Sequence, residues 1–202
     1  MRIIAGLYRG RRLVAPDGLD TRPTSDRVRE ALFSSLGPLA GARVADLYAG
    51  TGALGLEALS RGASRAVFVE EARSALRALR QNLTALAVAE HTRVIAAPVA
   101  RAASALIKEG PFDLVLIDPP YALLGEIAPV VEALLAASAI PPGARVVVEH
   151  ARKDPPPAIR GLDLRSTRGY GTTALSYYDR PAARAEEPAE AAEPEEPGEP
   201  MA

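Results

Sequence analysis

Between residues 43 and 149 the sequence alternates short apolar runs with longer stretches whose apolar residues recur at helical spacing. The runs are 43–47, 66–69, 93–96, 114–117 and 145–149, and the helical stretches between them are 54–61, 72–86, 100–108 and 127–137. A continuous apolar run indicates a strand buried on both faces, and a helix between two such strands brings the chain back so that they lie parallel. The sequence therefore predicts an α/β fold with a mostly parallel sheet covered by helices on both faces.

Segments on either side of this region complete the predicted fold. Residues 163–167 and 174–178 flank a polar loop and predict a strand–loop–strand ending, which gives a sheet of seven strands with an antiparallel last strand. Upstream, we expect a helix that is capped by Thr24 or Ser25 and ends at Leu36, just before a Gly-Pro pair.

Charge and composition divide the chain into three parts. Residues 1–21 hold a strand-like start and a Gly/Arg-rich turn, so we expect a basic β-hairpin extension there. Residues 22–180 form the main domain. Residues 181–202 are almost entirely Pro, Ala and Glu, with a net charge of −6, and we expect a disordered tail because this composition buries too little apolar surface.

The remaining chain is basic, and its charge is concentrated at the start. Residues 1–180 hold 23 basic and 18 acidic side chains, a net charge of +5, and residues 1–29 alone hold seven arginines against three aspartates. Such clustering is typical of an arm that binds a polyanion such as nucleic acid, although a solvated surface gives the same pattern.

Several classes of protein are disfavoured by what the sequence lacks. It contains no cysteine, which excludes disulfides, thiolate metal sites and cysteine nucleophiles, and its two histidines, His91 and His150, argue against a metal site. The sequence has no run of eighteen apolar residues, and its N-terminus does not resemble a signal peptide. We therefore expect a soluble, cytoplasmic monomer without a metal.

A glycine-rich loop follows the first predicted strand of the main domain. Gly50, Gly52 and Gly55 have the spacing Gly-x-Gly-x-x-Gly. The first two glycines permit a tight turn and close approach of a ligand, and the third permits close packing of the following helix. The spacing alone fits a dinucleotide site, and it also fits an ordinary strand-to-helix turn.

Two acidic residues near this loop favour a different cofactor. Glu70, eighteen residues after Gly52, ends the second strand, where a carboxylate can accept both ribose hydroxyls of an adenosine; Glu71 is the alternative. Asp46 lies in an apolar strand end, where an unpaired carboxylate is costly, so a ligand ammonium or buried waters would account for it. S-adenosylmethionine carries such an ammonium, whereas the pyrophosphate of NAD would be repelled.

The tetrapeptide Asp118-Pro119-Pro120-Tyr121 directly follows the apolar run 114–117. In an open α/β sheet this edge faces the ligand cleft. The Asp118 carboxylate and the Pro119 carbonyl can each accept one N–H of an exocyclic amino group, so that its lone pair points at a methyl donor. Both acceptors strengthen as positive charge develops on the nitrogen.

The rest of the tetrapeptide supports this interpretation. The two prolines fix the backbone, and Tyr121 offers a face on which a displaced base can stack. A plain strand-ending turn is the alternative. The tetrapeptide predicts a methyltransferase that acts on a nucleic-acid amino group, but it does not choose between guanine and adenine.

Over residues 1 to about 180 the sequence resembles the RsmD-type bacterial 16S ribosomal RNA (guanine-N2) methyltransferases. The motifs that carry the resemblance are Arg2–Gly6 with Arg9–Arg11, Thr21–Phe33, Asp46–Gly62, Val69-Glu70 and Asp118–Tyr121. The resemblance implies a Rossmann-like, seven-stranded methyltransferase fold with S-adenosylmethionine as donor. It also implies a guanine amino group of 16S ribosomal RNA in the small ribosomal subunit as acceptor.

The family's functional positions map onto this sequence, and we sort them by role. The resemblance assigns cofactor binding to Asp46, Gly50, Gly52, Glu70 and Thr24, catalysis to Asp118, Pro119 and Tyr121, and RNA contact to Arg9, Arg11, Arg12 and Arg22. There is one departure, because Ala97-Pro98 stands where such proteins often place an aspartate that receives the adenine amino group. The tail 181–202 also lies outside the family pattern.

Three other functions remain open at this stage. An adenine-N6 nucleic-acid methyltransferase would use the same tetrapeptide, an NAD-linked oxidoreductase would use the same glycine spacing, and a non-catalytic assembly factor would only bind ribosomal RNA. Stabilisation by NAD but not by S-adenosylhomocysteine would identify the oxidoreductase. A cellular role that survives Asp118→Ala would identify the assembly factor.

Overall fold

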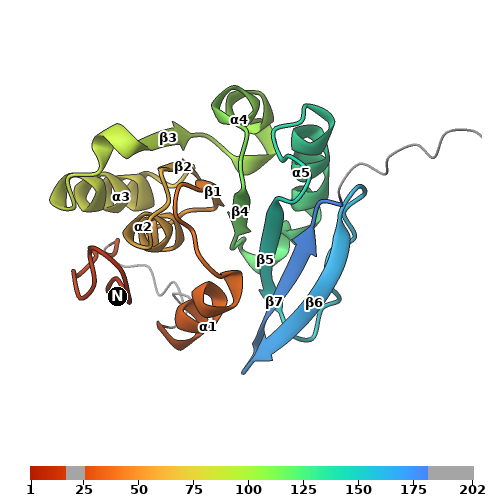
Figure 1. Ribbon diagram of the computed structural model, residues 1–202, viewed down its shortest axis with the longest axis horizontal. Helices are drawn as coiled ribbons and strands as arrows, with labels where there is room; N and C mark the ends of the chain where they lie inside the picture. Colours follow the sequence, from red (N-terminus) through yellow and green to blue (C-terminus); the bar gives the residue numbers. More distant parts are fainter. Residues whose placement is uncertain (17–25, 182–202) are drawn as a thin grey trace, which may run out of the picture.

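The computed structural model describes residues 1–16 and 26–181, and within them one seven-stranded sheet runs through the molecule (Figure 1). Its spatial order is β3-β2-β1-β4-β5-β7-β6. The strands are β1 Arg43–Leu47, β2 Arg65–Glu70, β3 Thr92–Ala96, β4 Leu114–Ile117, β5 Arg145–Ala151, β6 Asp163–Tyr170 and β7 Thr173–Asp179. The first five are parallel, and β7 is antiparallel to both β5 and β6. The predicted α/β fold is confirmed.

Five α-helices cover the two faces of the sheet. They are α1 Asp26–Leu36, α2 Ala53–Ser60, α3 Arg73–Ala85, α4 Ala103–Glu109 and α5 Ile127–Ala136. Helices α1, α2 and α3 pack on one face, and α4 and α5 pack on the other (Figure 1). Among the described residues, no helix has the length and apolar character required to cross a membrane.

The alternating side chains of the buried strands build two separate cores. In β1, Val44 packs with the α1 side and Ala45 and Leu47 pack with the α5 side. Phe68 is fully buried on the first side and Phe112 on the second. Each such aromatic contributes roughly 1.5–3 kcal/mol by leaving water. Asp46 is one of the few polar side chains buried within these strands.

The predicted helix boundaries differ from the observed ones by up to three residues, and the largest difference has a local cause. Helix α4 begins at Ala103 instead of residue 100, because a short 3-10 helix, η2 (Val99–Arg101), precedes it. Two further 3-10 helices, η1 (Ala89–His91) and η3 (Tyr121–Glu126), were not predicted. The proposed caps of α1, Thr24 and Ser25, lie outside the described residues.

Residues 1–16, here called the N-terminal arm, fold back on themselves beside α2. The arm contains one antiparallel bridge, between Arg2 and Arg12, instead of two regular strands. It is anchored by Glu57 of α2, which is fully buried and accepts the backbone N–H groups of Ile4 at 2.7 Å and Ala5 at 3.0 Å. The same carboxylate accepts Arg61 Nε at 2.8 Å. The sequence analysis gave Glu57 no role.

Candidate active site

The glycine loop joins β1 to α2 at the carboxyl edge of the sheet. Gly52 has a φ of +80°, and a Cβ there would lie 2.4 Å from Leu79 Cδ1. A Cβ on Gly55 would lie 2.4 Å from the Phe68 ring. A Cβ on Gly50, in contrast, would meet nothing within 4 Å. Gly52 and Gly55 therefore serve close packing, whereas Gly50 borders open space into which a ligand can come close to the backbone.

Asp46 lies under this loop and is 1% exposed. Its Oδ2 accepts the Gly55 N–H at 2.8 Å, while Oδ1 has no hydrogen-bond partner among the described residues. Burial raises the pKa of Asp46 well above 3.8, and the nearby carboxylates of Asp118 and Glu70 raise it further, while the Gly55 N–H acts in the opposite direction. A buried acceptor without a partner is costly, so this atom suits a cationic ligand group.

Glu70, at the end of β2, is hydrogen-bonded to the glycine loop. Its Oε2 accepts the Gly50 N–H at 2.8 Å, and its Oε1 accepts the N–H groups of Glu71 at 2.9 Å and Ala72 at 2.8 Å. These bonds fix the carboxylate at the end of β2 and use three of its about four acceptor positions, so one position remains for a ribose hydroxyl. Glu71 is exposed and itself donates to Glu70. The geometry favours Glu70 over Glu71 as the ribose acid.

Four acidic residues lie at or near the carboxyl ends of adjacent strands at this edge. By the alternation of side chains along each strand, all four fall on the face that α1 covers. They are Glu70 on β2, Asp46 on β1, Asp118 after β4 and Glu149 on β5. Ile117 pairs with Val148, so Asp118 and Glu149 are neighbours one residue further along. Glu149 is the member that the sequence analysis missed. The available signal was an acid that directly follows an apolar run, here Val146–Val148. Asp46 and Asp118 also follow apolar runs.

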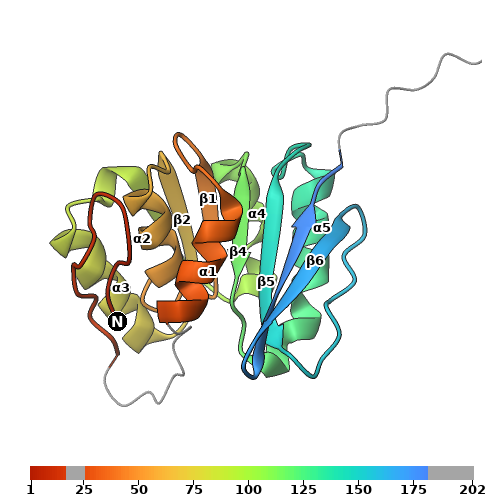
Figure 2. The ribbon, with the colours of Figure 1, turned by 60° about the horizontal axis from the view of Figure 1, so that its bottom comes forward.

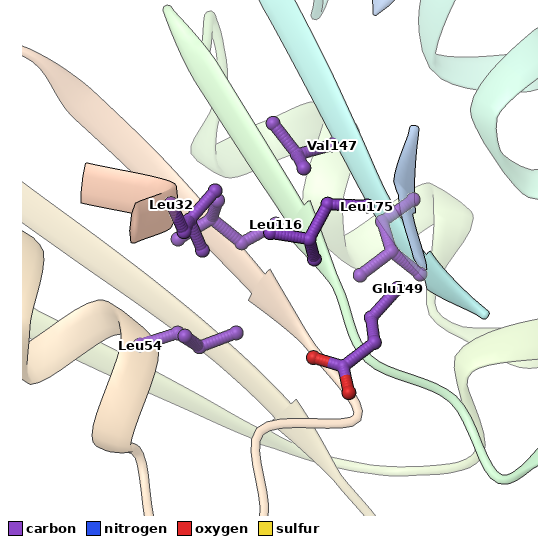
Figure 3. Close-up of a pocket in the computed structure, with 7 residues that line it drawn as sticks. Leu32, Leu54, Leu116, Val147, Glu149 and Leu175 are labelled. Atoms are coloured by element: carbon purple, nitrogen blue, oxygen red, sulfur yellow. The ribbon is translucent and has the colours of Figure 1, made fainter. Parts of the chain in front are cut away.

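Glu149 contributes the polar group of a small cavity between α1, α2 and the sheet (Figure 3). The other lining residues are apolar: Leu32, Leu54, Leu116, Ile117, Val147 and Leu175. In Figure 3 the Glu149 carboxylate extends from β5 toward the side of the cavity where Leu54 lies. An acceptor is therefore held next to Asp118 in largely apolar surroundings.

The tetrapeptide after β4 presents its residues differently. Asp118 is half-buried, and its backbone N–H reaches the Leu47 carbonyl at the end of β1 at 3.4 Å. Pro119 is buried and Pro120 is exposed. Tyr121 starts η3 and is 50% exposed, and its hydroxyl lies 3.5 Å from Thr173 Oγ1 at the start of β7. A flat aromatic group therefore stands at the surface beside the half-buried carboxylate.

The structure brings the predicted cofactor and catalytic residues to one edge, but not all the predicted RNA contacts. Arg9, Arg11 and Arg12 lie on the N-terminal arm, and Arg11 Nη2 donates to the Ala85 carbonyl at the end of α3 at 2.9 Å. The arm lies on the α2 and α3 side of α1 (Figure 2). Thr24 and Arg22 lie outside the described residues.

Ala97-Pro98, where the family pattern often has an aspartate, lies beside Glu70. The Ala97 N–H donates to the Glu70 carbonyl and to the Ile95 carbonyl, each at 3.1 Å. Both Ala97 and Pro98 are half-buried. This segment therefore borders the predicted adenosine position with backbone and apolar groups, where an aspartate was expected from the family pattern.

Comparisons with known proteins agree on one family. The family described as conserved hypothetical protein 95 matches residues 1–179. YlbH of Bacillus subtilis (strain 168), whose name proposes an rRNA methyltransferase, is 34% identical over 183 residues, 89% of this chain and 99% of that protein. Ribosomal RNA small subunit methyltransferase D of Escherichia coli (strain K12) is 46% identical over 123 residues, 60% of either chain.

Solved structures give the same result across nearly the whole fold. The structure of yhhF from Escherichia coli, also named as a proposed methyltransferase, has a TM-score of 0.76 at 38% identity and covers 90% of this chain and 98% of that one. A Thermus thermophilus protein, TTHA0928, has a TM-score of 0.73 at 33% identity, covering 89% and 99%.

Proposed function

The chain belongs to the RsmD-type family, described as conserved hypothetical protein 95, and from this premise we propose that it methylates the N2 amino group of a guanine in 16S ribosomal RNA. It is a methyltransferase, and S-adenosylmethionine is its methyl donor. The observation that best supports the specific reaction is the position of Asp118-Pro119, at the end of β4 and near Asp46 of the adjacent strand β1.

The residues present fit the donor. When bound, S-adenosylmethionine supplies an electrophilic methyl group on a positively charged sulfur. Asp46 Oδ1, buried and without a partner among the described residues, fits its ammonium directly or through water, and Glu70 fits a ribose hydroxyl. Gly50 lets the backbone come close to the ligand, and Gly52 keeps its cofactor assignment by resemblance. Thr24 keeps its assignment as a cofactor contact by resemblance alone.

The acceptor side of the reaction is assigned to the tetrapeptide. The Asp118 carboxylate and the Pro119 carbonyl accept the two N–H groups and direct the nitrogen lone pair at the methyl group. As the N–C bond forms and the S–C bond breaks, the nitrogen becomes positive and both acceptors bind it more strongly. The nitrogen then releases one proton, for which Asp118 is the nearest assigned base. Tyr121 stacks on the base.

The position of Glu149 favours guanine over adenine as the base that is methylated. The N1 position next to the amino group is an N–H donor in guanine and an acceptor in adenine. A carboxylate beside Asp118 can accept from guanine N1, but it would face the lone pair of adenine N1. A site whose polar group meets no partner discriminates strongly against that ligand. The position of Glu149 at the end of β5 therefore favours the guanine assignment.

Membership of this family also supports a proposal for the partner and the cellular setting. We propose that the enzyme acts as a monomer in the cytoplasm on RNA that is assembled in the small subunit, and that Arg9, Arg11, Arg12 and Arg22 contact RNA phosphates. Neutral replacements of the three arm arginines are expected to weaken RNA binding without weakening cofactor binding. Among the described residues no group of three acidic or histidine side chains is placed to hold a metal.

Mapping of the transferred label tests the proposal. Unmodified small subunits and naked 16S ribosomal RNA are incubated separately with methyl-labelled S-adenosylmethionine, and the labelled nucleoside is identified. Label on guanine N2, strongest in subunits, is expected. Label on adenine N6, or transfer only to DNA, would contradict the substrate assignment. Stabilisation by S-adenosylhomocysteine and not NAD, about 2.7 kcal/mol at a hundredfold excess over Kd, checks the donor independently.

A further inference from the structure

A second concentration of arginines lies on the α1 face of the sheet, away from the N-terminal arm. Side chains from β5, β6, β7 and the end of α1 line a hollow, here called the arginine hollow: Ser35, Arg145, Arg165, Ser166, Arg168 and Tyr177. Figure 2 shows β6 and β7 on one side of α1 and the arm on the other. Neither the sequence analysis nor the proposed mechanism gives these arginines a role.

An irregularity in β6 brings two of these arginines to the same place. In a regular strand, Arg165 and Arg168 would point to opposite faces, because their separation is an odd number of residues. The pairing of β6 with β7 shifts between Leu164 and Ser166. This β-bulge turns Arg165 to the side of Ser166 and Arg168, so that all three line the hollow. Bulges commonly redirect a side chain at a functional edge.

The hollow holds more arginine side chains than there are acidic side chains beside them. Arg145 Nε and Arg165 Nε lie 2.8 Å and 3.0 Å from the two oxygens of Asp179. Arg168 stacks over the Tyr177 ring, with 5.4 Å between its Cζ and the ring centroid. The ion pairs of Arg145 and Arg165 with Asp179 are made through Nε. Asp179 is paired across the strands with Asp163, so three guanidinium groups stand against two carboxylates and positive charge remains in excess. Guanidinium N–H groups match phosphate oxygens in geometry.

The hollow lies toward the amino end of β5, and the β6–β7 hairpin runs from it to the candidate active site. The β6–β7 hairpin begins beside the catalytic tetrapeptide, where Thr173 meets Tyr121 and pairs with Tyr170. Arg168 and Arg165 precede Tyr170 by two and five residues, which is about 7 Å and 17 Å along the strand. A strand of RNA with one base at Tyr121 could therefore place neighbouring phosphates over both arginines.

We propose that the arginine hollow binds the phosphate backbone of the RNA substrate, as a contact separate from the N-terminal arm. The proposal rests on the proposed function, since it presumes an RNA substrate. Positive charge spread along a strand edge favours a polyanion over a single small anion. Two basic surfaces on opposite sides of α1 would hold the RNA across the opening where Asp118 and Tyr121 lie, and thereby orient the base without reading its sequence.

The test compares two double variants of the full chain. Arg165→Gln/Arg168→Gln removes two charges from the hollow and keeps Arg145 on Asp179. Arg101→Gln/Lys108→Gln removes two exposed charges from η2 and α4, on the opposite face of the sheet. Binding of unmodified 16S ribosomal RNA is measured over a range of salt concentrations. Thermal unfolding and the Kd for S-adenosylhomocysteine are measured for each protein.

The hollow variant is expected to bind RNA roughly tenfold more weakly at about 0.1 M salt, with a salt slope lower by about one per arginine lost. The opposite-face variant should bind like the wild type, and cofactor affinity should be unchanged in both. Arg165→Lys/Arg168→Lys, which keeps the charges, should recover most of the slope. Recovery by lysine would separate a phosphate contact from a purely structural role for the Arg168–Tyr177 stack.

The outcomes separate this proposal from the proposed function. If the wild type binds RNA and the glutamine variant binds it with unchanged affinity and slope, the hollow is not a phosphate site, while the proposed function stands. If the wild type itself binds no ribosomal RNA, both fail. If the glutamine variant loses affinity without a change in slope, the loss is structural and the phosphate assignment is wrong.

Discussion

At the scale of single residues, the candidate site contains a buried carboxyl group that lowers the stability of the ligand-free protein. Asp46 is buried with one oxygen unpartnered among the described residues, and two further carboxylates, Asp118 and Glu70, raise its pKa. No packing purpose requires an acid there, since its neighbours Val44, Ala45 and Leu47 in β1 are apolar. A group that is unfavourable in the empty fold and complementary to a cationic ligand indicates a binding role.

Asp46→Asn should stabilise the ligand-free protein and weaken cofactor binding. With its pKa raised in the fold, Asp46 retains a proton that the unfolded chain releases above about 3.8, so stability falls as the pH rises from that value through the folded pKa. Asparagine cannot show this loss. The lost charged interaction predicts a Kd for S-adenosylhomocysteine about 10- to 100-fold higher. Unfolding scans over pH and calorimetric titration measure the two effects, with the exposed Asp163→Asn as control. An unchanged Kd would remove Asp46 from the binding site.

Glu149→Gln should lower kcat/KM for the RNA by about tenfold, the size expected for one lost hydrogen bond to a charged group. Cofactor affinity should stay constant, because the proposed function places Glu149 at the acceptor base and not at the cofactor. The exposed Glu30→Gln on α1 controls for the change in charge. Steady-state kinetics on unmodified small subunits give the comparison. Equal kcat/KM for variant and wild type would show that Glu149 does not contact the base.

At the scale of elements, the apolar runs of the sequence predicted six of the seven described strands within two residues, because strands buried on both faces leave continuous apolar runs. The mostly exposed β6 extends three residues past its predicted end at residue 167. The 3-10 helix η3 was not predicted, since Tyr121–Glu126 has neither a run nor a period. The β-bulge at Leu164/Ser166 was also beyond the sequence, because a pairing shift depends on the partner strand. Those two irregular elements position Tyr121 and the arginine hollow.

The attachment of the arm to α2 supports a prediction at this scale. Glu57→Ala leaves Arg61 and two arm N–H groups without their acceptor, which should destabilise the protein by about 3 kcal/mol. The arm should then open more often and expose Arg9, Arg11 and Arg12 to trypsin. Urea unfolding and limited proteolysis measure both effects, with Glu30→Ala as control. Cleavage at the wild-type rate in native conditions would mean that Glu57 does not hold the arm.

At the scale of the whole molecule, the sheet brings together residues that are far apart in sequence. Asp46, Glu70, Asp118 and Glu149 meet because adjacent parallel strands end at one edge. Three of these four acids were predicted, since each followed a recognisable loop, strand or tetrapeptide. Glu149 and the arginines of the hollow were missed because their significance depends on which strands become neighbours. The motifs could be predicted from the sequence, but which of them lie side by side depends on the order of the strands in the sheet.

The central claim is that Asp118 acts on the acceptor nitrogen of ribosomal RNA and not on the cofactor or the fold. Single-turnover methyl transfer to unmodified small subunits by wild type and Asp118→Asn tests it most directly, with the Kd for S-adenosylhomocysteine measured on the same proteins. The account predicts a rate about 10²- to 10³-fold lower in the variant with an unchanged Kd. A variant that transfers methyl groups at close to the wild-type rate would contradict it.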